Sequence, residues 1–261
     1  MSLMHALLLA LIQGVTEFLP VSSSAHLQLV QFVTPFPAHD KLYDVGLHGA
    51  TLLAVLLYFR HDLTQMTIGS LRALQGQITP PFYKVQCLII STLPVIITGA
   101  CVSLFEISFP ETWLGANMII FGILIGWADH KGRKNRTQEE ITRMEALVIG
   151  MCQAFAVVPG VSRLGACLIG TLMIGLSRVE ALKYALLLSI PSVVGAIAMT
   201  VFKESAGKEL VWDYTMTVGA CMALSIAMMT LRWVFVWLSH NSLRPIVIYR
   251  IIIGLVILLG R

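Results

Sequence analysis

The chain has 261 residues, of which 57% are hydrophobic and only 12% are charged, and its formal net charge is +4. Because soluble domains carry about 25% charged residues, this composition excludes an ordinary soluble enzyme and indicates an integral membrane protein. The five cysteines are odd in number and widely spaced, which argues against a disulfide framework or a zinc site.

Apolar segments of two lengths follow one another along the chain. They are short at 4–16 and 25–33, long at 43–60, 85–105 and 113–128, short again at 146–158 and 164–176, and long at 184–202, 214–236 and 245–260. A transmembrane helix needs about 20 apolar residues, whereas pieces of about 10–14 residues are more typical of re-entrant segments. The pattern predicts an all-α integral membrane fold with about six transmembrane helices and two re-entrant helical hairpins. The hairpin tips, rich in Pro, Ser and Gly, should lie inside the protein beside a cavity or buried partners.

The two predicted hairpins resemble each other in sequence. At an offset of 140 residues the identical pairs are Met4/Met144, Ala6/Ala146, Leu7/Leu147, Gln13/Gln153, Val21/Val161 and Ser22/Ser162. Each repeat contains one hairpin and three spans, and three spans reverse the side of the membrane, so the repeats should be inverted. We expect a single polytopic membrane domain over 1–261, with repeat 1 at about 1–128, a loop at about 129–143 and repeat 2 at about 144–261.

Basic residues are distributed unequally between the two sides of this topology. Four loops on one side carry 12 of the 18 Lys and Arg residues: 60–84, 129–143, 177–183 and 238–250. The other side carries Lys41, Lys203, Lys208 and Arg261. The positive-inside rule therefore makes the four loops cytoplasmic and turns both termini outward. The basic run at 130–136 is then a topology determinant beside anionic lipid, and we expect no nucleic-acid partner.

Polar residues gather at the first tip, whose sequence is QGVTEFLPVSSSAH, Gln13 to His26. Glu17 lies four residues after Gln13, so the two side chains share one face if this stretch is helical. A proline, three serines and a histidine follow. The residues therefore place a carboxylate, hydroxyl groups and an imidazole at one break in the chain.

The second tip, PGVSRLGAC, places Arg163 between two apolar segments without charge. A guanidinium at bilayer depth costs at least ~2.5–3.5 kcal/mol, so such a residue is a functional-site hypothesis by default. If the tips meet, one pocket would be surrounded by Glu17, Ser22, Ser23, Ser24, His26, Ser162 and Arg163. This set supplies an acid/base carboxylate, a nucleophile or proton donor, and an anion anchor.

These motifs resemble the undecaprenyl-diphosphate phosphatases of the bacitracin-resistance type. The resemblance covers essentially the whole chain and rests on QGVTEFLPVSSSAH, on the span LHGATLLAVLLYFR and on PGVSR. It implies removal of the terminal phosphate from undecaprenyl diphosphate, a membrane lipid, which recycles the lipid carrier of cell-wall synthesis. It also implies a bacterial inner-membrane protein whose pocket, formed by two inverted re-entrant motifs, opens to the outer, periplasmic side.

The chemistry of a diphosphate substrate suggests a role for each polar residue. Arg163 can bind phosphate oxygens bidentately, and N–H groups of the Gly160–Gly165 turn offer a second anion site. We expect the catalytic residues to be Glu17, His26, Ser23 and Arg163, and the substrate-binding residues to be Gln13, Ser22, Ser24, Gly160, Ser162 and Gly165. By resemblance, a divalent cation, Mg2+ or Ca2+, lies near Glu17 and Gln13. Whether His26 or Ser23 attacks phosphorus stays open.

Other interpretations of the same residues remain. Glu17 could be a structural partner of Arg163 alone, and the serines could cap the helix after the break. His48, inside the first span, is interpreted as a packing histidine.

The alternative function is a non-enzymatic carrier or flippase of prenyl-phosphate or another anionic lipid, because inverted repeats with broken helices are a transporter architecture. Glu17 and His26 argue against it, and the sequence leaves a homodimer open.

The chain departs from the family pattern PGxSRSxxT at two positions. Leu164 and Cys167 stand where serine and threonine are usual, so two hydroxyl groups near the phosphate are missing. We expect Leu164→Ser to raise activity or leave it unchanged, since it restores one neutral donor whose net contribution is ~0.5–1.5 kcal/mol.

Overall fold

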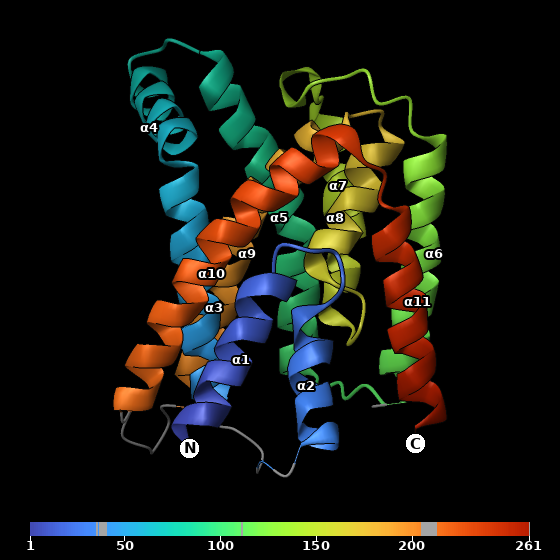
Figure 1. Cartoon of the computed structure of the whole chain (residues 1–261). Helices are drawn as coiled ribbons and strands as arrows, with labels where there is room; N and C mark the ends of the chain where they lie inside the picture. The colour runs from blue at the N-terminus through green and yellow to red at the C-terminus, as the bar shows by residue number, and fades with distance from the viewer. Residues whose placement is uncertain (35, 37–40, 111, 205–212, 261) are drawn as a thin grey trace.

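The computed structural model describes residues 1–34, 36, 41–110, 112–204 and 213–260. Lys208 and Arg261, which entered the charge count, lie outside these ranges. Within them the protein is all-helical, as predicted, and has no β-strand (Figure 1). The helices are α1 (Leu3–Thr16), α2 (Ser23–Val33), α3 (Lys41–Tyr58), α4 (Arg60–Leu74), α5 (Pro80–Leu104), α6 (Trp113–Lys131), α7 (Arg143–Ala154), α8 (Arg163–Met173), α9 (Arg178–Glu204), α10 (Tyr214–His240) and α11 (Arg244–Leu259), with 3-10 turns η1 (Gln138–Glu140) and η2 (Phe155–Val157).

The long helices fall where the long apolar segments predict them. Among the described residues, α5, α9 and α10 are each long and apolar enough to cross a membrane, and α3 with α4 makes a fourth such unit that bends by 74° at its break. Helices α6 and α11 are shorter, with 19 and 16 residues. The expected loop at 60–84 instead begins with helix α4. Hydropathy misses this helix because its apolar residues alternate with polar ones and never form a continuous run.

The short segments form two helical hairpins, α1 with α2 and α7 with α8. In Figure 1 the hairpins enter the bundle from opposite ends, and their tips meet near its middle. Ser22 and Ser162, which lie 140 positions apart, have φ angles of 71° and 70°. Residues other than glycine rarely adopt this left-handed region. The same unusual turn therefore breaks both hairpins.

Local signals explain how the second hairpin is built. Helix α7 begins with a capping box in which Thr142 and Glu145 satisfy each other's backbone N–H groups. Helix α8 begins after Ser162, whose Oγ accepts a hydrogen bond of 3.1 Å from the N–H of Gly165. Ser162 is thus a capping serine, whereas Ser22 makes no side-chain cap at the start of α2.

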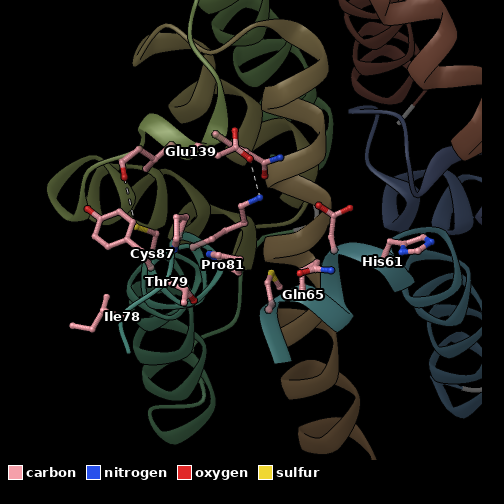
Figure 2. A pocket seen from close by; sticks show the side chains of 14 residues that line it. His61, Gln65, Ile78, Thr79, Pro81, Cys87 and Glu139 are labelled. Atoms are coloured by element: carbon pink, nitrogen blue, oxygen red, sulfur yellow. Dashed lines mark hydrogen bonds and ion pairs between the residues drawn. The ribbon is translucent and has the colours of Figure 1, made fainter. Parts of the chain in front are cut away.

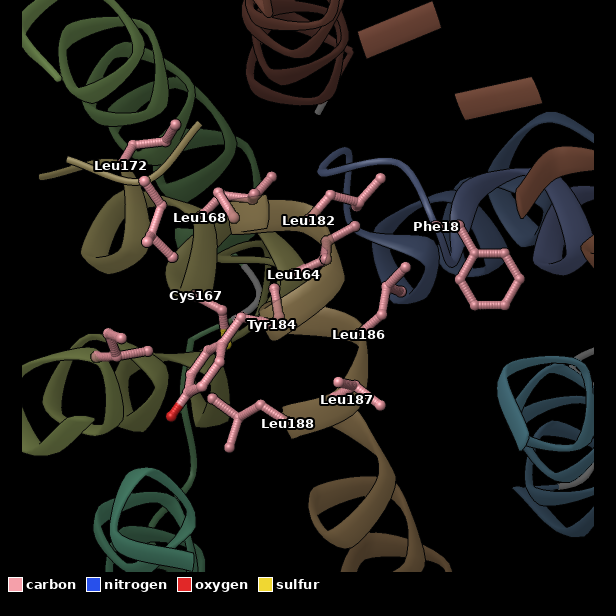
Figure 3. Close-up of a cluster of buried hydrophobic side chains, with 14 of the residues drawn as sticks. Phe18, Leu164, Cys167, Leu168, Leu172, Leu182, Tyr184, Leu186, Leu187 and Leu188 are labelled. Atoms are coloured by element: carbon pink, nitrogen blue, oxygen red, sulfur yellow. The ribbon is translucent and has the colours of Figure 1, made fainter. Parts of the chain in front are cut away.

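Helix α8 lies at the centre of the main apolar core. All its residues from 164 to 172 are buried, and they pack beside a leucine-rich stretch of α9 (Figure 3). Cys167 is fully buried here. A buried free thiol packs as a small apolar side chain, so Cys167 belongs to the core around α8, and it does not line the Glu17 cavity.

Candidate active site

Glu17 lies at the centre of a hydrogen-bonded cluster that joins the two hairpin tips. Its Oε1 accepts a hydrogen bond of 2.5 Å from Nη2 of Arg163. Its Oε2 accepts hydrogen bonds from Ser23 Oγ at 2.6 Å and from Gln13 Nε2 at 3.0 Å. The Glu17 side chain is only 8% exposed. Glu17 and Arg163 are therefore each other's partners, and the two tips meet as the sequence predicts.

A cavity of about 320 Å³ opens beside this cluster, and we call it the Glu17 cavity. Its lining residues are Thr16, Glu17, Ser22, Ser23, Ser24, Gln28, His48, Ala156, Val157, Val158, Pro159, Gly160, Ser162, Arg163 and Leu164. Seven of the predicted site residues thus surround one space, with Ser22 Oγ and Ser24 Oγ 3.3 Å apart. Gln13 is fully buried behind Glu17.

Gly165 and His26 do not line the Glu17 cavity. The N–H of Gly165 is bonded to Ser162 Oγ, and a Cβ at Gly165 would lie 2.9 Å from Ile125 Cδ1, so this glycine permits close packing of α8. His26 is 8% exposed; its Nδ1 lies 2.8 Å from the carbonyl oxygen of Ser22, and its Nε2 lies 2.8 Å from the hydroxyl of Tyr249. His26 therefore links the first tip to α11.

His48 lies at the site, although sequence analysis interpreted it as a packing residue. Its Nδ1 is 3.0 Å from Gln13 Nε2 and 3.6 Å from Glu17 Oε2, and the ring lines the Glu17 cavity. Nδ1 of His48 therefore lies within hydrogen-bonding distance of the Gln13 amide. An imidazole inside an apolar span was the only signal that could have identified this residue.

Arg250 on α11 holds the two tips together. The side chain is fully buried, and its four hydrogen bonds all go to backbone carbonyl oxygens: Met118 at 2.9 Å, Pro20 at 2.7 Å, Gly160 at 2.6 Å and Val161 at 2.6 Å. The charge count placed this residue in the cytoplasmic loop at 238–250, which is wrong because it lies inside α11. A cation within the apolar segment 245–260 was the signal for its role.

Glu17 and Gln13 supply too few ligands to hold a divalent cation alone, so they fit such an ion only when the substrate supplies further ligands. The described residues contain no group of three His, Cys, Asp or Glu side chains that could hold a metal. However, Gln13 Oε1 is buried next to Glu17 and has no partner among them. The repeat-equivalent Gln153 uses both ends of its amide, bonding Ser91 O and Ser192 Oγ. Mg2+ is commonly held by one or two carboxylates plus substrate phosphates, and Glu17 with the free Gln13 oxygen fits that mode.

A larger cavity, of about 600 Å³, lies away from this cluster (Figure 2). Helix α4, the start of α5 and the η1 turn line it, and it shares no lining residue with the Glu17 cavity. Its lysine, Lys84, is already paired with Glu139 at 3.1 Å. Of these two cavities, the Glu17 cavity is the one that combines a carboxylate and hydroxyl groups with an arginine.

Comparison with known proteins identifies the family of this chain. The family model described as "Bacitracin resistance protein BacA" matches residues 6–256. The chain is 35% identical to an undecaprenyl-diphosphatase of Dinoroseobacter shibae, over 99% of this chain and 98% of that protein. It is 36% identical to the undecaprenyl-diphosphatases of Ruegeria pomeroyi and Roseobacter denitrificans, with the same coverage. The chain therefore belongs to the bacitracin resistance protein BacA family.

Proposed function

We propose that this protein hydrolyses undecaprenyl diphosphate to undecaprenyl phosphate and inorganic phosphate. One observation carries the proposal. A carboxylate, Glu17, is hydrogen-bonded both to a hydroxyl group and to an arginine at a cavity inside a bundle of apolar helices. The names of the relatives support the same substrate. The role in recycling the lipid carrier of the cell wall follows from the product.

In the proposed mechanism, Arg163 binds the terminal phosphate. Only Nη2 of its guanidinium donates to Glu17, so other N–H groups can face phosphate oxygens and neutralise the charge of the transition state. Glu17 Oε2 takes the proton from Ser23 Oγ, which lies 2.6 Å away. Ser23 Oγ then bonds to the terminal phosphorus, and the bond from this phosphorus to the bridging oxygen breaks. Undecaprenyl phosphate leaves, and water hydrolyses the phosphoserine.

We propose Ser23 rather than His26 as the nucleophile. Ser23 lines the Glu17 cavity and is bonded to a base, whereas His26 does not line the cavity and both its ring nitrogens are already engaged, by Ser22 O and by the Tyr249 hydroxyl. The proposal also includes a divalent cation, Mg2+ or Ca2+, held by Glu17 and Gln13 together with substrate oxygens. When bound, such an ion neutralises phosphate charge and orients the leaving group.

A lipid carrier without hydrolysis is not favoured. A site that only binds an anionic headgroup gains nothing from a buried carboxylate beside its arginine, because the carboxylate repels the ligand. Here Glu17 also holds a serine hydroxyl at hydrogen-bonding distance. Purified protein in detergent should release inorganic phosphate from undecaprenyl diphosphate in step with the appearance of undecaprenyl phosphate. Tight binding of the lipid without phosphate release would favour the carrier.

We propose that the membrane arrangement comprises six spans and two re-entrant hairpins in an inverted repeat, with the Glu17 cavity open to the periplasmic side of the inner membrane. The paired turns at Ser22 and Ser162, and the excess of basic residues in the four predicted cytoplasmic loops, support this arrangement. Cysteines placed at Arg133 and Lys208 in a cysteine-free background should label from opposite sides, Lys208 from outside. Labelling of both from one side would contradict the inverted repeat.

A further inference from the structure

A second cavity, of about 390 Å³, adjoins the Glu17 cavity and is almost entirely apolar. Its walls are one face of α5, from Val95 to Ala100, and one face of α9, from Pro191 to Met199. We call this space the tail groove. Ala156, Val157 and Arg163 line both the tail groove and the Glu17 cavity. Arg163 therefore stands at the boundary between a polar space and an apolar one.

The tail groove contains empty space beside two glycines, and it opens toward the lipid-facing surface. A Cβ atom added at Gly99 or at Gly195 would meet no atom within 4 Å, so both glycines border empty space. At the mouth, Ile96 is 54% exposed and Met199 is 39% exposed. Large apolar side chains with this exposure, on helices able to cross a membrane, face lipid. The groove thus leads sideways from Arg163 into the bilayer.

We infer that the tail groove binds the first isoprene units of the substrate's prenyl chain while Arg163 holds the diphosphate. The inference rests on the proposed function and adds where the tail lies. An amphiphilic substrate needs an anion site and an apolar site in contact, and these two cavities share three residues. A volume of this size suits a small drug-sized ligand. It therefore encloses only the start of a long chain, whose remainder stays in the lipid.

The open glycines allow the groove to be filled without disturbing the fold. Gly99→Leu and Gly195→Leu place an apolar side chain in the empty space and remove the room for the prenyl chain. The matched control is Val194→Phe, which enlarges a neighbouring side chain that is half exposed and does not line the groove. Kinetics with undecaprenyl diphosphate test tail binding, and the inhibition constant of inorganic diphosphate, which has no tail, tests the anion site.

We expect either glycine variant to raise KM for undecaprenyl diphosphate about tenfold, since a misfit of a few methylene groups in an apolar pocket has effects of this order. The inhibition constant of inorganic diphosphate and both parameters of Val194→Phe should not change. An unchanged KM would overturn the inference. A parallel rise of KM and of the inhibition constant would also overturn it, because the substitutions would then act on the anion site.

A second measurement does not depend on hydrolysis. A prenyl diphosphate analogue with a photoreactive group in its first isoprene units should crosslink to residues 95–100 and 191–199 of the unmodified protein. Crosslinks confined to other helices would show that the tail lies elsewhere. Absence of phosphate release by the unmodified protein would refute the proposed function, whereas the crosslinks would still decide where the chain binds.

Discussion

Arg163 and Glu17 are separated by 146 residues in the sequence, yet Nη2 of the arginine lies 2.5 Å from Oε1 of the glutamate. Glu17 precedes the break of the first hairpin, and Arg163 follows the break of the second. Both hairpins are therefore needed to place the two charges at one cavity. Intramembrane charges are stable only when paired or hydrogen-bonded. The pair therefore stabilises the meeting of the two tips, and it places the guanidinium group of Arg163 at the Glu17 cavity.

The first prediction concerns the shape of the Arg163 side chain. Arg163→Lys keeps the charge and a donor for Glu17 but loses the planar group that binds two phosphate oxygens at once. We expect at least about a tenfold loss in kcat/KM, equivalent to ~1.4 kcal/mol of transition-state stabilisation. Arg178→Lys, which alters an arginine paired with Asp129 outside the cavity, is the matched control. Equal kinetics for Arg163→Lys and the unmodified protein would show that bidentate binding is unimportant.

The second prediction concerns His48, which the sequence analysis interpreted as a packing residue. Because His48 contacts the Gln13 amide and lines the Glu17 cavity, we expect His48→Ala to lower kcat/KM about tenfold or more, within the range of acid–base and electrostatic contributions. His61→Ala, which alters an exposed histidine of the larger cavity, should have no effect. Unchanged phosphate release in His48→Ala would restore the interpretation of this residue as packing.

The third prediction concerns the tether from α11. A lysine at position 250 has only three donors on one atom, so Arg250→Lys loses at least one of the four buried hydrogen bonds of the guanidinium. We expect a loss of stability of at least about 1–3 kcal/mol and a fall in phosphate release, since the tips lose their common anchor. Thermal unfolding in detergent measures the first effect. Arg244→Lys, at an exposed position of the same helix, should match the unmodified protein, and a normal melting temperature for Arg250→Lys would contradict the tether.

The fourth prediction concerns pH. Hydrogen bonds from Arg136 and from the Thr142 cap lower the pKa of Glu145 from 4.5 to about 2. A lowered pKa means that the charged form stabilises the fold above about pH 4.5 and that this contribution is lost as the pH falls toward 2. The melting temperature of Glu145→Gln should therefore lie below that of the unmodified protein at neutral pH, and the difference should shrink in acid. Glu106→Gln, at an exposed site, is the control. A difference that stays constant with pH would exclude ionisation of Glu145 as its cause.

Segment lengths and tip residues predicted much of this architecture. The two hairpins and the long helices follow from where apolar runs stop, whereas the sequence offered the Glu17–Arg163 contact only as one of two interpretations of these charges. Helix α4 could not be predicted in this way, because a mixed polar and apolar segment has no hydropathy signal. Its place depends on packing against α5.

Individual side chains were harder to place than helices. Arg250 lies six residues inside α11, but only the folded tips provide the carbonyl groups that explain it. Histidine is a common catalytic residue type, yet His26 contacts Tyr249 of α11, which lies 223 positions later in the sequence. Leu164 lines the cavity and also belongs to the apolar core, with 6% exposure, so the effect of Leu164→Ser depends on which environment the hydroxyl meets. Sequence spacing does not encode such long-range contacts.

The most direct test of the account is the rate of phosphate release from undecaprenyl diphosphate by purified Glu17→Gln protein. The substitution keeps the size of the side chain but removes the charge that pairs with Arg163 and the base that accepts the Ser23 proton. Acid–base catalysis by a positioned side chain contributes typically 10²–10⁴-fold, so we expect kcat to fall by at least about a hundredfold while the protein remains folded. Phosphate release at a near-normal rate by folded Glu17→Gln would contradict the central claim that Glu17 is the catalytic base of this site.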